Sequence, residues 1–91
     1  MSFTVLLHPK VAKELGKIGN ATKARIVERL MDLKDSPERG GKVLRHSNFC
    51  SLRVGDYRAI YEIDRTRKQV VVLFIGHRKK VYNDFSKLFK I

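Results

Sequence analysis

The fold is decided by residues 48–63, with the sequence NFCSLRVGDYRAIYEI, in which two alternating runs flank a glycine–aspartate pair. Apolar and polar side chains alternate over residues 48–54 and again over residues 57–63, which is the pattern of half-buried β-strands. Gly55-Asp56 between them is a two-residue turn signal of the kind that joins antiparallel strands. The stretch therefore predicts a β-hairpin.

The length of the turn fixes which residues of the hairpin face each other. With a two-residue loop, Val54 lies opposite Tyr57 and Arg53 lies opposite Arg58. The same register gives the further pairs Leu52–Ala59 and Cys50–Tyr61. The core face of the hairpin is then expected to carry Cys50, Leu52, Val54, Tyr57, Ala59, Tyr61 and Ile63. The other face carries Phe49, Ser51, Arg53, Arg58, Ile60 and Glu62. Cys50 is therefore expected to be a packing residue rather than a nucleophile.

The residues before the hairpin predict one strand and two helices. Residues 3–7 are rich in strand formers, and Pro9 suits the first turn of a helix that follows them. Gly19-Asn20 ends this helix, and a second helix runs to Ser36-Pro37. The buried sides of the two helices are expected to carry Val11, Leu15 and Ile18 in the first and Ile26, Val27, Leu30, Met31 and Leu33 in the second.

The residues after the hairpin complete a small α+β domain. A basic turn at residues 64–68 leads to the run 70–75, which is apolar on both faces and predicts a central strand covered on both sides. Residues 76–80 end this strand. A short helix from near Asn83 is expected to bury Phe85, Leu88 and Phe89. The order is an N-terminal strand, a two-helix hairpin, an antiparallel three-strand meander and a short C-terminal helix, in a single domain over residues 1–91.

The charge of the chain predicts a polyanionic or acidic partner. The 91 residues carry a net charge of +11, and 43% of them are hydrophobic, as in an ordinary globular domain. Residues 1–41 hold eight Lys and Arg against five Asp and Glu, whereas residues 42–91 hold twelve against four. The bland alternative is a heavily charged surface of the heat-stable type, but there acids rise with bases, and here they do not.

Composition and spacing argue against several other classes of protein. No apolar run is long enough to span a membrane, and the first residues do not read as a signal peptide. A single cysteine allows no internal disulfide, which fits a reduced, cytoplasmic setting. The three histidines have no metal-ligand spacing with Cys50 or the acids, and no Lys-Ser/Thr of a phosphate loop follows Gly40-Gly41. We therefore expect no metal and no cofactor.

Arg53 and Arg58 stand side by side on the predicted hairpin, on the face turned away from the core. Like charges opposite each other on paired strands destabilise by on the order of a few tenths of a kcal/mol, so the fold gains nothing from the pair by itself. A phosphate that accepts paired guanidinium hydrogen bonds explains the arrangement. The alternative is a carboxylate, from Glu62, Asp56 or elsewhere, that neutralises the pair.

A second basic cluster follows the last predicted strand and consists of His77, Arg78, Lys79 and Lys80. Antiparallel pairing brings the end of this strand to the start of the preceding one, where Arg58 lies. The two clusters are therefore expected to converge on one surface. Tyr82, just beyond them, is either a packing residue or an exposed ring on which a base stacks.

The chain resembles the RelE/ParE toxin superfamily over nearly its whole length. The resemblance rests on the order of elements and on two motifs, LRVGDYRAIY at residues 52–61 and GHRKKVY at residues 76–82. It implies a RelE-like fold and a ribosome-dependent endoribonuclease, which cleaves messenger RNA in the ribosomal A site by attack of the 2′-hydroxyl. It also implies inhibition by a small acidic antitoxin similar to RelB.

The resemblance assigns roles to residues as well. It implies that Arg58 contacts the scissile phosphate, that Arg78 stabilises charge or protonates the leaving oxygen, and that Tyr82 stacks on a base. Arg53 is expected to add phosphate binding on the motif strand. The remaining residues expected to bind RNA are Lys42, Arg45, His77, Lys79 and Lys80.

One departure from the family leaves the general base open. RelE members carry lysines, proposed as the base, at the outward strand positions that Phe49 and Ser51 occupy here. The candidates that could replace them are Arg53, Lys42, Arg45, His46 and His77. Arginines hold phosphate oxygens well but transfer protons badly at neutral pH, so alignment by the ribosome would carry part of the catalysis. Two alternatives stay open: DNA gyrase inhibition, as in ParE-like members, and a nucleic-acid-binding module without catalysis.

Overall fold

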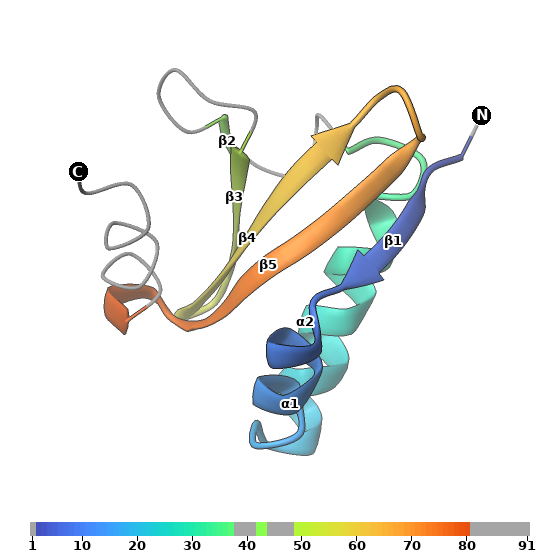
Figure 1. The fold of residues 1–91 in the computed structure, drawn as a ribbon. Coiled ribbons are helices and arrows are strands. Elements are labelled where there is room, and N and C mark those ends of the chain that lie inside the picture. Colours follow the sequence, from blue (N-terminus) through green and yellow to red (C-terminus); the bar gives the residue numbers. More distant parts are fainter. Residues whose placement is uncertain (1, 38–41, 44–48, 81–91) are drawn as a thin grey trace.

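The computed structural model describes residues 2–37, 42–43 and 49–80, and these residues form one sheet with two helices against it (Figure 1). The strands are β1 (Thr4–Leu7), β2 (Lys42–Val43), β3 (Phe49–Val54), β4 (Tyr57–Asp64) and β5 (Gln69–His77), in the order β1-β5-β4-β3-β2. β1 is parallel to β5, and the other neighbours are antiparallel. The helices are α1 (Pro9–Leu15) and α2 (Asn20–Asp32). The predicted α+β class is confirmed.

The two helices begin where the sequence predicts and end earlier. Pro9 lies in the first turn of α1, and the His8 side chain caps it by accepting a hydrogen bond from the Lys10 amide at 3.1 Å. α1 ends at Leu15, before Ile18, which still packs against the core. α2 ends at Asp32 rather than at Ser36-Pro37. None of the helices in the described part of the chain is long and apolar enough to cross a membrane.

The predicted buried side of α2 is wrong at two positions. Val27 is 39% exposed and Met31 is 45% exposed, whereas Ile26 and Leu30 are buried. A helix turns by about 100° per residue, so the stripe that starts at Ile26 continues at Leu30 and Leu33 and leaves Val27 and Met31 to one side. The core therefore takes up one stripe of α2, and Val27 and Met31 lie outside it.

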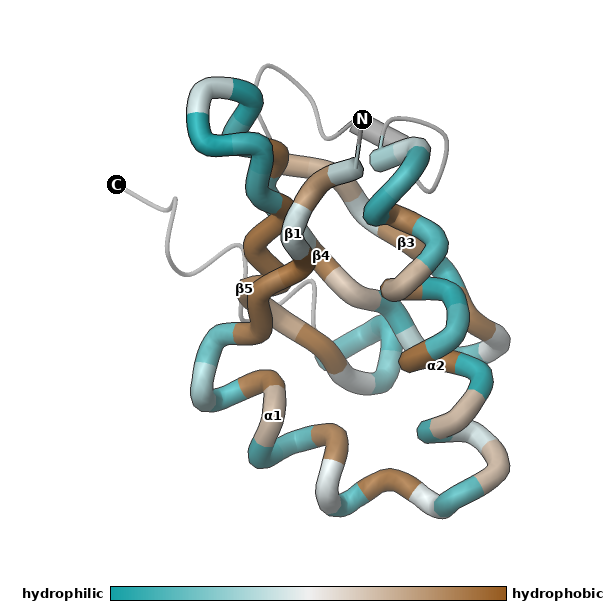
Figure 2. Tube along the Cα trace, turned by 90° about the vertical axis from the view of Figure 1, so that its right-hand side faces the viewer, coloured by the Kyte–Doolittle hydropathy of each residue, from teal (hydrophilic) through white to brown (hydrophobic). Residues whose placement is uncertain are grey.

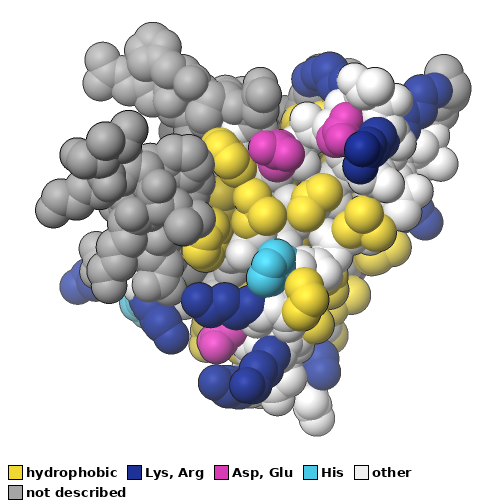
Figure 3. Space-filling view, in the orientation of Figure 1, with side chains coloured by type: hydrophobic (Ala, Val, Ile, Leu, Met, Phe, Trp, Pro, Cys, Tyr) yellow, Lys and Arg dark blue, Asp and Glu magenta, His cyan; other side chains and the backbone are white. Residues whose placement is uncertain are grey.

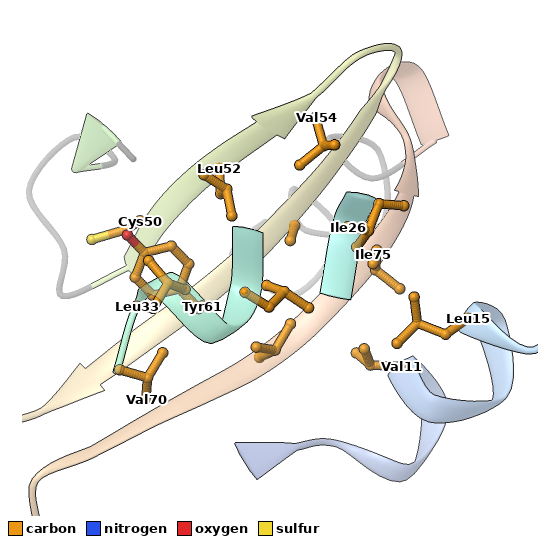
Figure 4. Close-up of a cluster of buried hydrophobic side chains, with 13 residues drawn as sticks. Val11, Leu15, Ile26, Leu33, Cys50, Leu52, Val54, Tyr61, Val70 and Ile75 are labelled. Carbon is orange, nitrogen blue, oxygen red and sulfur yellow. The ribbon is translucent and has the colours of Figure 1, made fainter. Parts of the chain in front are cut away.

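The core lies between the helices and one face of the sheet, which we call the core face (Figure 4). Figure 2 shows the same division along the chain, with apolar residues concentrated on β4 and β5 and spaced at intervals on the helices. The buried side chains of the core are Val11, Leu15, Ile26, Leu30, Leu33, Cys50, Leu52, Val54, Ala59, Tyr61, Val70, Val72 and Ile75. Cys50 is thus a packing residue, as expected.

β5 is the central strand that its apolar sequence predicts, but it is not fully covered on both sides. Val70, Val72 and Ile75 are buried, while Val71 and Phe74 are only half-buried. A bulge interrupts the strand, because Ile60 pairs with Phe74 and Tyr61 pairs with Val72, which leaves Leu73 between them.

Two further differences concern the ends of the sheet. β5 continues through Gly76 and His77, although the sequence predicts that the strand ends before them. β2 was not predicted, because two residues are too few for an alternating pattern to show. The C-terminal helix expected from Asn83, with Phe85, Leu88 and Phe89, lies outside the described residues.

Tyr61 joins the sheet to the segment that follows α2, and this bond can be tested. Its side chain is fully buried, and its hydroxyl donates a hydrogen bond to the Pro37 carbonyl at 2.7 Å. Burial, with a smaller contribution from Cys50, raises the pKa of the Tyr61 hydroxyl above its ordinary value, so it remains a neutral donor. Tyr61→Phe is expected to lower the free energy of unfolding by about 1–2 kcal/mol, because a buried carbonyl loses its donor.

Urea denaturation of both proteins measures this difference, with the dependence on urea concentration unchanged. Tyr57→Phe is the matched control, because the Tyr57 ring is only half-buried. Equal stability of Tyr61→Phe and the unmodified protein would contradict the assigned role.

Candidate nucleic-acid interface

The β3–β4 hairpin has the register that its turn predicts. Val54 pairs with Tyr57, and Arg53 pairs with Arg58. Gly55 has a φ of 60°, while Asp56 is not among the residues with positive φ. Positive φ at the first central position alone is the pattern of a type II′ turn, which favours glycine there. The turn thus keeps the two arginines opposite each other.

The face of the sheet that carries Arg53 and Arg58 is opposite the core face, and we call it the site face. Cross-strand partners project to the same side of a sheet, so Ser51 and its partner Ile60 also belong to the site face. Both side chains are buried, at 3% and 0% exposure, so this face is not simply open to solvent. Lys42 on β2 is the backbone partner of Ser51.

Each of the paired arginines donates a hydrogen bond to a neutral oxygen. The exposed Arg53 donates from Nε to the Gly55 carbonyl at 3.1 Å. The half-buried Arg58 donates from Nη1 to the Ser51 hydroxyl at 3.1 Å. Neither acceptor carries a charge, so these two bonds orient the guanidinium groups without cancelling their positive charge.

The alternative reading, in which a carboxylate neutralises the pair, is not met at Arg53. Among the described residues, Arg53 makes no ion pair, whereas Lys17 and Glu14 form one on the helical side at 3.5 Å. Glu62 lies on the site face, but it pairs with Phe49, four residue pairs farther from the turn than Arg53–Arg58. The positive charge of Arg53, at the turn end of the hairpin, is therefore not paired with a carboxylate of the described residues.

Arg78 is brought to the same turn, as the antiparallel arrangement predicts. Its backbone amide donates to the Asp56 carbonyl at 2.9 Å, and Arg58 pairs with Gly76 at the end of β5. The two turn carbonyls therefore bind two arginines, Gly55 through the Arg53 side chain and Asp56 through the Arg78 backbone. We call Arg53, Arg58 and Arg78 the arginine cluster.

His77 lies close to the arginine cluster in sequence but on the other side of the sheet. It pairs with Tyr57, a core-face residue, and the two rings meet edge to face with centroids 6.2 Å apart. Lys79 and Lys80 are exposed on the helical turn that follows β5. The basic run at residues 77–80 is thus not gathered as a whole on the site face, because His77 lies on the core side.

The structure leaves some predicted residues unplaced and adds one that the sequence did not indicate. Tyr82, Arg45 and His46 lie outside the described residues. Ser51 was predicted to share a face with Arg58, but neither its burial nor its bond to Arg58 could be read from alternation. In the described part of the chain, no group of three or more His, Cys, Asp and Glu side chains could hold a metal ion.

Known proteins are similar to this chain in sequence and in fold. Residues 5–82 match the family described as the ParE toxin of the type II toxin-antitoxin system parDE. The chain is 35% identical over 85 residues to Toxin RelG of Mycobacterium tuberculosis, which covers 90% of this chain and 98% of that toxin.

Solved structures agree with this match. The toxin–antitoxin complex RelBE2 of Mycobacterium tuberculosis contains a chain with a TM-score of 0.78 and 34% identity, covering 86% of this chain and 100% of that one. For the archaeal RelE–RelB complex from Pyrococcus horikoshii the TM-score is 0.77 at 26% identity, with 86% and 97% coverage. A free Escherichia coli RelE mutant, at 20% identity, a TM-score of 0.80 and 96% and 97% coverage, shares the fold. The chain therefore belongs to the ParE/RelE family of toxins from type II toxin–antitoxin systems.

Proposed function

We propose that this toxin is a ribosome-dependent endoribonuclease that cleaves messenger RNA in the ribosomal A site by attack of the 2′-hydroxyl. The observation that carries the proposal is the arginine cluster, in which Arg53 faces Arg58 and both are held by neutral oxygens. Two like charges on facing strand positions destabilise the hairpin unless an anion binds them. A phosphodiester supplies that anion, and a guanidinium binds its oxygens in pairs.

The reaction requires removal of the 2′-hydroxyl proton, stabilisation of the charge on the phosphorane and stabilisation of the leaving 5′-oxygen. The arginines suit the last two of these tasks. Arg58 holds the scissile phosphate and stabilises the extra negative charge on the phosphorane. Arg78 stabilises or protonates the leaving 5′-oxygen, and Arg53 adds phosphate binding beside Arg58. Tyr82 stacks on a base. The residues proposed to bind the flanking RNA are Lys42, Arg45, His77, Lys79 and Lys80, with His77 reaching the RNA where it passes round the end of the sheet.

The third task, removal of the 2′-hydroxyl proton, explains the proposed need for a ribosome. An arginine stays protonated far above neutral pH and is a poor base. Phe49 and Ser51 offer no lysine on the site face. Alignment of the attacking oxygen with the phosphate by the ribosome lowers the barrier, so that a weak base suffices, and Lys42, the backbone partner of Ser51, is one of the candidates for it.

Inhibition of DNA gyrase is the second candidate function. The matching family is described by its ParE members, and neither Phe49 nor Ser51 is a lysine. A gyrase toxin needs no RNA-cleaving residues, so the arginine cluster would then serve a protein contact.

The proposed partner is a small acidic antitoxin of the RelB type. A net charge of +11 favours an acidic protein, and the relatives from Mycobacterium tuberculosis and Pyrococcus horikoshii are found in RelB–RelE complexes. Figure 3 views the molecule from the side on which β1 and β5 lie in front of α2, and apolar side chains gather in its centre. Leu6, 40% exposed, pairs with the half-buried Val71 and contributes apolar area that a partner can cover.

Removal of single arginines tests the proposed cleavage. Arg58→Ala and Arg78→Ala are each expected to slow cleavage by about 100-fold or more, because each removes a charge that stabilises the transition state. Purified toxin is added to ribosomes stalled on a defined message, and primer extension maps the new 5′ ends. Arg25→Ala on the outer surface of α2 is the matched control, with the same loss of charge, and should cut normally.

Intact message at the A site with folded, unmodified toxin would sink the cleavage proposal. A supercoiling assay with gyrase on the same preparation then decides for or against the second candidate.

Coexpression tests the partner. The reading frame next to the toxin is expected to encode a short acidic protein that copurifies with it and prevents cleavage. If that frame encodes no such protein, or if the two separate in low salt, the antitoxin assignment is wrong.

A further inference from the structure

We propose that Ser51 is a positioning residue for Arg58, directing its guanidinium group over the site face without reducing its charge. The inference rests on the proposed RNA-cleaving function, because it concerns the arginine assigned to the scissile phosphate. It concerns a serine of β3 that lies beside Arg53 and Arg58 on the site face.

Burial of Ser51 is the first observation. Its side chain is 3% exposed in the middle of β3, and apart from the Tyr61 hydroxyl and the Cys50 thiol no other polar or charged side chain is buried among the described residues. A hydroxyl removed from water is costly unless it is hydrogen-bonded. The Ser51 hydroxyl accepts the bond from Arg58 Nη1 at 3.1 Å, so burial and orientation are coupled.

The position of Ser51 is the second observation. Ser51 is paired with Ile60, two residue pairs farther from the turn than Arg53–Arg58 and therefore next to that pair on the same face. It therefore reaches Arg58 from the side away from the turn, while the Gly55 carbonyl binds Arg53 at the turn itself. The two guanidinium groups are held from opposite ends of the cluster, which limits how far each can swing.

The chemistry of a hydroxyl explains why serine suits this position. A carboxylate would orient Arg58 more strongly, but it would cancel the charge that a phosphate needs. Alanine would fit the strand but would leave Nη1 without this acceptor. The neutral oxygen of Ser51 orients the guanidinium group and does not itself cancel its charge.

Kinetics on the ribosome test the proposal with a pair of variants. Ser51→Ala is expected to lower the maximal rate of cleavage by about 10- to 100-fold, since a misplacement of about 1 Å has effects of that size. The toxin concentration that gives half the maximal rate should change little, because the other basic residues still bind the ribosome. Ser51→Thr, which keeps the hydroxyl, should restore the rate, and Thr66→Ala in the β4–β5 turn should leave it unchanged.

A second measurement is independent of activity. The side-chain Nε–H signal of Arg58 is expected to report a rigid group in the unmodified protein and in Ser51→Thr, and a mobile one in Ser51→Ala, by ¹⁵N relaxation. Thermal denaturation checks that all variants are folded at the assay temperature. If Ser51→Ala cuts at the normal rate, or if Arg58 stays equally rigid in it, Ser51 does not position Arg58. If the unmodified toxin cuts nothing, the proposed function fails, and the relaxation measurement alone decides the role of Ser51.

Discussion

The two-residue turn at Gly55-Asp56 is the constraint on which the rest of the site depends. Its positive φ at Gly55 allows the tight connection that sets Arg53 opposite Arg58. Its two carbonyls then bind the Arg53 side chain and the Arg78 backbone. A slip of one residue would send the arginines to the core face and would separate them from the end of β5. One local backbone choice therefore places three basic residues that are up to 25 positions apart in the chain.

The core and the site use opposite faces of the same strands. Leu52 and Ala59 bury their side chains under α1 and α2, while their neighbours Arg53 and Arg58 project the other way. Packing of the core face holds the strands in register, and its stabilisation offsets the repulsion between the two arginines on the opposite face. Two hydrogen bonds to neutral oxygens, from Arg53 to the Gly55 carbonyl and from Arg58 to the Ser51 hydroxyl, direct the guanidinium groups on the site face.

The parts of this arrangement that the sequence predicted are those set by neighbouring residues. Alternation and the Gly55-Asp56 signal were enough for the hairpin register and for the return of β5 toward Arg58. Features that depend on packing between distant elements were missed or wrong. Val27 and Met31 have the right spacing for a core but lie beside the line of contact with the sheet. The bulge at Leu73 and the burial of Ser51 likewise leave no pattern in the local sequence.

The most direct test of the arginine cluster is to observe its side chains while RNA binds. The Nε–H signals of all arginines would be followed by NMR as a short RNA with 2′-O-methyl groups, which cannot be cleaved, is added. The account predicts that Arg53, Arg58 and Arg78 shift together and saturate at one RNA concentration, while Arg25 on α2 and Arg67 in the β4–β5 turn remain unchanged. Equal shifts at Arg25 and Arg67 would show that the RNA binds by charge alone, and would contradict a site at the turn.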